Sequence, residues 1–177
     1  MAPDNAASPF ADAPEWLPLM ETLALLHAPA HTGAAAPAAR FGFRTGGLGW
    51  LLPAAAHSEI VMRPGINPFP GTQPWFDGLL NLRGHLVPVF DLGRWLGATR
   101  TGTRHLLAIG RGERVAAVWS DGLPETLDAA PPPAPPARVP TPLRPYVQGG
   151  RAHGGEIWLE IHFETLFADL GSRIALE

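Results

Sequence analysis

The stretch GLLNLRGHLVPVFDL, residues 78–92, constrains the fold of this chain more than any other segment. It holds two short apolar runs, residues 79–82 and 86–90, on either side of a polar turn. Short apolar runs that are bounded by turn residues are typical of buried strands. Gly84 in the turn can adopt the positive φ that a tight reversal requires. The stretch therefore predicts a β-hairpin that presents the guanidinium of Arg83 at its tip.

The far end of the predicted hairpin carries signals of its own. Pro88 has no backbone N–H to donate to a neighbouring strand, so we expect it at a sheet edge or at a bulge. Asp91 is a favoured N-cap residue, and a short helix over residues 92–96 that ends at Gly97 is expected to follow it. Nothing in this stretch is a nucleophile or a set of metal ligands, so it is typical of a binding element.

Composition excludes several classes of function. The net charge of the 177 residues is −3, which gives no electrostatic reason to expect nucleic acid or anionic lipid as a partner. The chain has no cysteine, which excludes a disulfide framework and thiolate metal sites and fits a reducing cytoplasm. We find neither a signal peptide nor an apolar run of the roughly 18 residues that a membrane span needs.

Two segments are expected to lie outside the folded core. Residues 1–39 combine a Pro-rich start, a helix-like apolar pattern at residues 15–27 and an Ala/Pro linker, which predicts a flexible extension with one short helix. Residues 131–145, PPPAPPARVPTPLRP, are typical of a polyproline-type excursion on the surface and cannot form a central strand.

The rest of the chain predicts a mostly all-β fold. With 20 glycines and 21 prolines, it favours short strands joined by turns over long helices. About nine strands are expected from the apolar patterns, at residues 40–44, 48–53, 58–62, 79–82, 86–90, 105–110, 114–119, 123–127 and 156–161. Apolar residues at helical spacing then predict a terminal helix from Phe163 that ends at Gly171. Many short strands at close spacing favour small barrels over an α/β sheet.

The hairpin stretch resembles the signature of the CheW coupling proteins, which are adaptors of bacterial chemosensory arrays. The family pattern is Gly, two aliphatic residues, Asn-Leu-Arg-Gly, two variable or aliphatic positions, Pro-Val, one aliphatic residue and Asp-Leu. The chain matches this pattern from Gly78 to Leu92. The resemblance extends more loosely over residues 40–170.

Upstream of the hairpin the resemblance is incomplete. Pro53, Glu59 and Ile60 match the family pattern. Ala54 and His57 do not, because they stand where the family has aliphatic residues that pack a groove.

The resemblance implies a fold of two interlocked five-stranded SH3-like barrels around one core, with a short N-terminal and a C-terminal helix. It implies an extension at residues 1–39 and a CheW-like domain at residues 40–171. The first barrel would cover about residues 46–98, and the second residues 40–45 plus 103–171.

The resemblance also implies a function. The protein would be a cytoplasmic adaptor without catalytic activity or cofactor, which joins the cytoplasmic tip of a methyl-accepting chemoreceptor to the regulatory domain of a CheA-type histidine kinase. It would neither bind nucleic acid nor insert into the membrane. The N-terminal extension is more similar to the coupling proteins of systems that control type IV pili and twitching motility. A flagellar chemotaxis role is the alternative.

The candidate binding residues are those that match the family near the turn. The resemblance assigns the receptor to a groove between the barrels near this turn, and the kinase to the far barrel. The set is Glu59, Ile60, Asn81, Leu82, Arg83, Gly84 and Val87. From the residues alone, Asn81 is favoured as a turn residue that bonds its own backbone. Arg83 could equally be a solvated charge at a loop tip.

A metal-dependent enzyme is the alternative from another class. The chain has seven histidines, and His27 and His31 are four residues apart, but Pro29 between them disrupts the helix that would align them. No zinc, hydrolase or nucleotide motif occurs, so we expect no metal, cofactor or catalytic residue. Trp75 is interpreted as a core residue rather than an exposed interface anchor.

Overall fold

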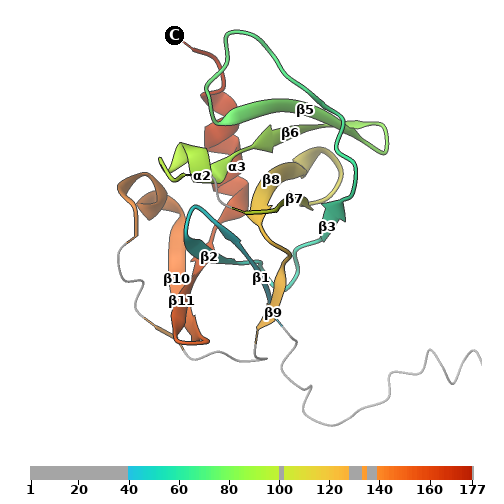
Figure 1. Ribbon diagram of the computed structural model, residues 1–177. Coiled ribbons are helices and arrows are strands. Elements are labelled where there is room, and N and C mark those ends of the chain that lie inside the picture. The colour runs from blue at the N-terminus through green and yellow to red at the C-terminus, as the bar shows by residue number, and fades with distance from the viewer. Residues whose placement is uncertain (1–39, 100–101, 128–132, 135–138, 177) are drawn as a thin grey trace, which may run out of the picture. The chain divides into compact units, whose positions relative to one another are not determined.

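The computed structural model describes residues 40–99, 102–127, 133–134 and 139–176, and backbone pairing gathers the strands of these residues into two sheets (Figure 1). The order in sheet A is β10-β11-β2-β1-β9, with bounds β1 Arg40–Thr45, β2 Leu48–Leu51, β9 Glu125–Leu127, β10 Val147–His153 and β11 Glu156–Ile161. The order in sheet B is β3-β7-β8-β6-β5-β4, with bounds β3 Ser58–Val61, β4 Ile66–Asn67, β5 Phe76–Leu82, β6 His85–Phe90, β7 Arg104–Ile109 and β8 Ala116–Asp121.

The two sheets interlock because sheet B is built from one continuous part of the chain. All six of its strands fall between Ser58 and Asp121, whereas sheet A takes strands from both sides of that stretch. Strand β11 joins the two parts of sheet A by pairing in parallel with β2, with Leu159 opposite Trp50. In Figure 1, sheet B lies above sheet A, and helix α3 (Phe163–Ser172) rises from the end of β11 toward the level of β5.

The residue ranges that were predicted for the two barrels do not match the strand pairing in the two sheets. Sequence analysis placed residues 46–98 in one barrel, but β2 pairs within sheet A, and β7 and β8 pair within sheet B. Sheet B also has six strands rather than five. The division was drawn along the chain, whereas β2 pairs both with its neighbour β1 and with β11, which lies more than a hundred residues away in the sequence. The mostly β fold with a C-terminal helix is confirmed.

A shared core joins the two sheets and α3. Phe43 and Trp50 of sheet A stack with ring centroids 5.9 Å apart, and Phe163 of α3 packs 6.1 Å from Phe43. Phe90 of sheet B continues the same cluster and stacks on Phe167 at 6.0 Å. A second, smaller cluster lies inside sheet B and contains Leu80, Val87, Val89, Leu106, Ala108 and Ala117. Trp75 was predicted to be a core residue, and it is half-buried and packs against the shared core.

The helix cap at the root of the β5–β6 hairpin forms as predicted, but Pro88 lies neither at a sheet edge nor at the bulge of this hairpin. Helix α2 (Leu92–Trp95) begins after Asp91, whose Oδ1 accepts a hydrogen bond from the Arg94 N–H at 2.9 Å. Pro88 pairs with Leu79 of β5, whereas the pairing of β6 with β8 begins at Val89. Its missing N–H therefore faces no strand, although β6 is an inner strand of the sheet.

Three elements differ from expectation. The Pro-rich segment contains a 3-10 helix, η2 (Thr141–Tyr146), whose three-residue turn places Leu143 and Tyr146 together in the core. Strand β10 was not predicted because VQGGRAH has no apolar alternation. Helix α3 continues through Gly171 to Ser172, because Arg173 caps it with an N–H bond to the Leu170 carbonyl at 3.0 Å. The predictions for residues 1–39 lie outside the described residues.

Within the described part of the chain, no helix is long and apolar enough to cross a membrane. The same residues contain no group of three or more His, Cys, Asp or Glu side chains that could hold a metal ion.

Candidate partner-binding site

The tip of the β5–β6 hairpin is a two-residue turn in a conformation that disfavours arginine. Leu82 pairs with His85, so Arg83 and Gly84 alone make the reversal, with φ of 54° and 87°. Two positive φ values in a two-residue loop are the geometry of a type I′ turn, which Asn-Gly fits best. Arg83 is the one residue other than glycine with positive φ among those described. The sequence thus has a guanidinium where glycine or asparagine would be less strained.

Asn81 has the structural role that its position in the turn suggested. Its Oδ1 accepts a hydrogen bond from the Gly84 N–H at 2.9 Å. This bond fixes the loop that carries Arg83. Asn81 therefore holds the tip in shape, as an Asx-type turn residue does.

Arg83 reaches across sheet B to Glu59. Its Nη2 donates a hydrogen bond to Oε2 of Glu59, which lies on β3 at the opposite edge of the sheet from β4. The Arg83 side chain is 71% exposed and that of Glu59 is 24% exposed. Exposed ion pairs add about 0–1 kcal/mol to folding stability, so this pair contributes little to the fold. It holds the guanidinium in one place on the surface.

A hollow of about 300 Å³ lies beside this pair, and we call it the tip hollow. Leu82, Val87, Ala108 and Val115 supply its apolar wall, at the end of the second core cluster. The polar residues around it are His57, Glu59, Arg83, His85 and Arg111. It is therefore the open end of sheet B, with apolar side chains inside and ionisable groups around them.

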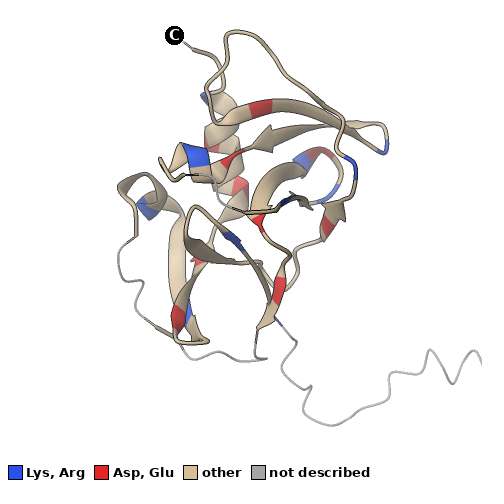
Figure 2. Cartoon of the chain, in the orientation of Figure 1, with Lys and Arg blue, Asp and Glu red and all other residues tan. Residues whose placement is uncertain are grey.

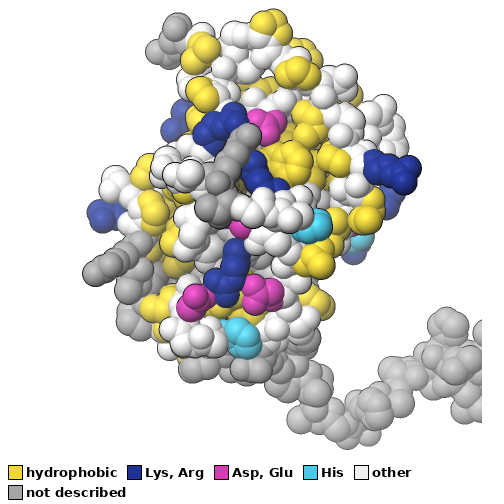
Figure 3. Space-filling model, in the orientation of Figure 1, with side chains coloured by type: hydrophobic (Ala, Val, Ile, Leu, Met, Phe, Trp, Pro, Cys, Tyr) yellow, Lys and Arg dark blue, Asp and Glu magenta, His cyan; other side chains and the backbone are white. Residues whose placement is uncertain are grey.

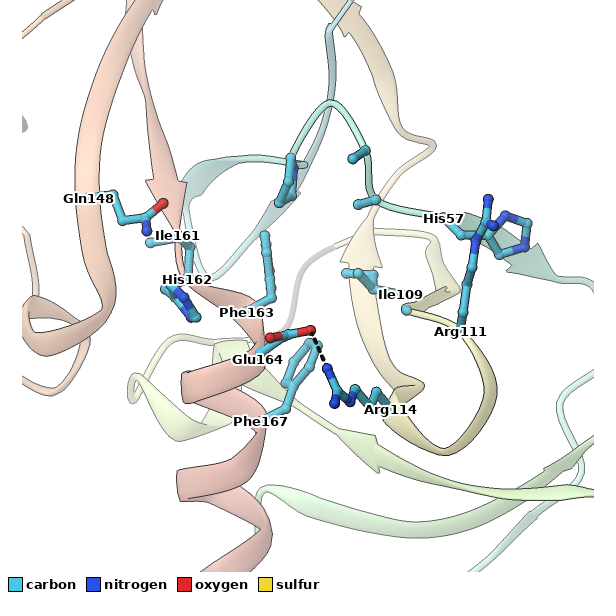
Figure 4. Close-up of a pocket in the computed structure, with 14 residues that line it drawn as sticks. His57, Ile109, Arg111, Arg114, Gln148, Ile161, His162, Phe163, Glu164 and Phe167 are labelled. Carbon is cyan, nitrogen blue, oxygen red and sulfur yellow. Dashed lines mark ion pairs between the residues drawn. The ribbon is translucent and has the colours of Figure 1, made fainter.

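A larger hollow of about 560 Å³ lies between the two sheets, and we call it the inter-sheet hollow (Figure 4). Phe163 and Phe167 enter it from α3, and Ile109 faces them from the end of β7. Arg114 and Glu164 bridge it with Nη1 and Oε1 3.6 Å apart. The two hollows share His57, Gly110 and Arg111 in their linings, so they adjoin each other.

The structure brings together four of the seven predicted site residues. Glu59, Leu82, Arg83 and Val87 all line the tip hollow. Val87 is 1% exposed and belongs to the core, so it can offer a partner only the inner wall of the hollow.

The other three predicted residues do not line the hollow. Ile60 is half-buried and packs against the shared core. Asn81 and Gly84 shape the turn, as described above. Asn81 and Gly84 therefore set the conformation of the tip.

Sequence reasoning missed the residues that the β7–β8 connection contributes. This connection contains the 3-10 turn η1 (Gly112–Arg114), and none of its residues is in the predicted site. It carries Arg111 to the tip hollow and Arg114 to the inter-sheet hollow. The available signal was the pair of arginines in the turn sequence RGER, but no local pattern showed which surface they would face.

Basic residues gather on this side of the domain. Figure 2 shows blue at the tip of the β5–β6 hairpin, and blue together with red in the β7–β8 connection, where Glu113 lies between Arg111 and Arg114. Dark blue side chains stand at the right edge of the face in Figure 3, at the height of the hairpin tip. The whole chain has a net charge of −3, so the arginines of the hairpin tip and of the β7–β8 connection are a local feature.

Comparisons with known proteins agree with this architecture. The family model described as CheW-like domain matches residues 41–171. Protein PilI of Pseudomonas aeruginosa is 38% identical over 56 residues, which cover 32% of this chain and 32% of that protein, so the match spans about a third of the relative's length. The crystal structure of the scaffolding protein TtCheW from Thermoanaerobacter tengcongensis has a similar fold, with a TM-score of 0.57 at 23% identity over 72% of this chain and 92% of the other.

Proposed function

The chain belongs to the CheW-like domain family, and from that premise we propose that it is a non-enzymatic adaptor that couples a chemoreceptor to a CheA-type histidine kinase. The family match over residues 41–171 carries this proposal. The hairpin tip supports it, because an exposed arginine is kept in a left-handed conformation and oriented by Glu59. Backbone strain of this kind is frequent at functional sites.

The proposal assigns the two partners to different surfaces. The cytoplasmic tip of the receptor binds over the tip hollow and the inter-sheet hollow, where apolar walls and charged groups meet. The regulatory domain of the kinase binds the part of the domain away from Arg83. The protein works in the cytoplasm, where both partners are accessible, and it binds neither nucleic acid nor the membrane directly.

We assign the adaptor to a system that controls type IV pili. The similarity to Protein PilI supports this assignment, as does the N-terminal extension that the shortest family members lack. In the source bacterium, deletion of the gene should abolish directed twitching and leave swimming chemotaxis unchanged. The opposite pattern would place the protein in flagellar chemotaxis.

A pull-down with the full chain tests the coupling function. The bait should capture the kinase regulatory domain and the cytoplasmic hairpin of at least one receptor from the same cell, separately and together. Capture of both at once is expected, because an adaptor needs two surfaces that do not overlap. If no kinase domain and no receptor hairpin of that cell binds, the proposal is wrong.

A further inference from the structure

We propose that the tip hollow accepts an aspartate or glutamate side chain of the bound receptor, and that Arg111 is the residue that recognises this carboxylate. The inference rests on the proposed function, because it names the chemistry by which the receptor is recognised at that surface. It assigns a role to Arg111, which does not belong to the residues matched in the hairpin stretch.

The charges around the hollow favour an anion. Two arginines and two histidines line it against a single carboxylate, that of Glu59. Glu59 already forms an ion pair with Arg83. The remaining charge of the hollow is therefore positive, within a chain whose net charge is −3. Complementary charge across an interface is a main source of binding specificity.

Arg111 is the cation that remains available. Among the described residues its side chain makes no ion pair or hydrogen bond, in contrast to Arg83 with Glu59 and Arg114 with Glu164. It is exposed in the β7–β8 connection. An arginine can bind a carboxylate through two parallel N–H···O bonds, which gives geometric as well as electrostatic selectivity.

Backbone contacts hold Arg111 beside His57. The Gly110 N–H donates to the His57 carbonyl at 2.9 Å, which ties the β2–β3 loop to the β7–β8 connection. Gly110 has a φ of 113°, and a Cβ there would lie 2.3 Å from the Arg114 carbonyl oxygen, so the connection is folded tightly at this point. In Figure 4 the side chains of His57 and Arg111 lie at the same end of the inter-sheet hollow.

The apolar surroundings favour a protein side chain over a free anion. The apolar wall of the tip hollow is formed by Leu82, Val87, Ala108 and Val115, and the adjoining inter-sheet hollow is lined by Phe163 and Phe167. An occupant that fills both hollows must bring apolar groups and an anion together. A receptor segment with aliphatic side chains beside an aspartate or glutamate meets this requirement, whereas inorganic phosphate does not.

A charge swap in the full chain tests the proposal. The probe is the receptor hairpin captured in the pull-down, measured by titration calorimetry against the wild type, Arg111→Glu and Arg63→Glu. Arg63 is the matched control, because it is exposed and lines neither hollow. Arg111→Glu should weaken binding about tenfold or more, since it places like charges together. Arg63→Glu should bind as the wild type does.

Receptor variants complete the experiment. Each Asp and Glu of the hairpin is changed to Lys in turn, and one of these changes should weaken binding to the wild type and restore binding to Arg111→Glu. The restored binding also shows that Arg111→Glu is folded.

The possible failures are distinguishable. If the wild type binds the hairpin and Arg111→Glu binds it equally well, the carboxylate site is wrong and the adaptor function stands. If no receptor hairpin binds the wild type, the adaptor function fails and this inference fails with it. If inorganic phosphate shifts the backbone amide signals of residues 110–112 and the hairpin does not, the hollow is a small-anion site, which also overturns the proposal.

Discussion

The β5–β6 hairpin has an arginine–carboxylate pair at each end, and the two pairs differ in almost every physical respect. At the tip, Arg83 and Glu59 are 71% and 24% exposed. At the root, Arg104 and Asp91 are 14% and 1% exposed, with Arg104 Nη1 3.1 Å from Asp91 Oδ2. Water screens the first pair and is excluded from the second. The same chemistry therefore serves recognition at one end and folding at the other.

The root pair belongs to a connected network. Asp91 also caps α2 through the Arg94 N–H. The Arg104 guanidinium lies 4.8 Å from the ring centroid of Trp119, and the Trp119 indole donates to Asp77 at 2.7 Å. Removing one member leaves a buried charge that has lost its nearest partner, although Arg94 lies 3.9 Å from Asp91 and Asp121 lies 3.9 Å from Arg104. The tip pair has no such dependence, because water can replace either partner.

Of the two ends of the hairpin, the root is where a substitution should have the larger effect on stability. Asp91→Ala should destabilise the fold by about 4 kcal/mol, because it removes the helix cap and leaves the half-buried Arg104 charge without its main partner. Asp91→Asn keeps a capping oxygen and should cost about 3 kcal/mol. Urea unfolding of both variants measures the difference. A loss below about 1 kcal/mol for either would show that the root pair behaves like a surface pair.

The next effect concerns the apolar residue beside the tip. Leu82→Asp should destabilise the fold by about 2 kcal/mol, since Leu82 is half-buried and packs against the second core cluster. The same change at Leu80, which is 3% exposed, should prevent folding. Circular dichroism melts separate the two cases. Equal melting temperatures for the two variants would mean that the tip is as well packed as the interior.

Reversal of the tip charge should separate binding from stability. Arg83→Glu should change the free energy of unfolding by less than about 1 kcal/mol, because the side chain is exposed. It should still weaken receptor capture strongly, since it places two carboxylates together on the binding surface. Thermal melts and the pull-down are run on the same sample. If this variant binds the receptor at full strength, Arg83 is not part of the binding site. If it loses much of its stability, Arg83 is a structural residue.

A smaller and opposite effect is expected from Arg83→Asn. Asparagine adopts positive φ more easily, and Asn-Gly is the preferred type I′ turn, so the variant should be about 0.5 kcal/mol more stable than the wild type. It should also bind the receptor less well. The denaturant midpoint checks the first expectation. A lower midpoint would mean that the pair with Glu59 outweighs the strain of the turn.

The smallest effect on stability is expected at alkaline pH. It comes from the hydrogen bonds among Tyr146, Asp169 and Arg173. The Tyr146 hydroxyl donates to Asp169 and accepts from Arg173 Nη2 at 3.1 Å. Burial and then the bond to Asp169 raise the pKa of Tyr146 above its ordinary value of 10.0. The folded state therefore keeps a proton that the unfolded chain releases, so stability should fall as the pH rises through 10.

Spectroscopy can test this directly because Tyr146 is the single tyrosine of the chain. Tyrosinate absorbance should titrate at higher pH in the folded protein than in urea, and Tyr146→Phe should abolish the signal. It should also remove the part of the stability loss above pH 10 that comes from this group. Equal midpoints in the folded and the unfolded protein would contradict the expected shift.

The sequence alone determined the local elements of this protein. The two apolar runs around the turn predicted the hairpin, and Asp91 predicted the start of α2, because strand alternation, turn chemistry and capping depend on neighbours within a few residues. The family pattern also identified the tip as the place to look for a partner site. Arg83 and Glu59 were both in the predicted set, although no local rule showed that they form a pair.

Only the tertiary structure decided how these elements combine. It pairs β2 with β11 across the whole domain, and it makes Val87 a wall of the hollow rather than a surface contact. It also ties the His57 loop to Gly110, which carries Arg111 to the site from a different part of the chain. Such contacts follow from long-range pairing and from a shared core. No local pattern records them, because the residues that meet are separated by dozens of positions along the chain.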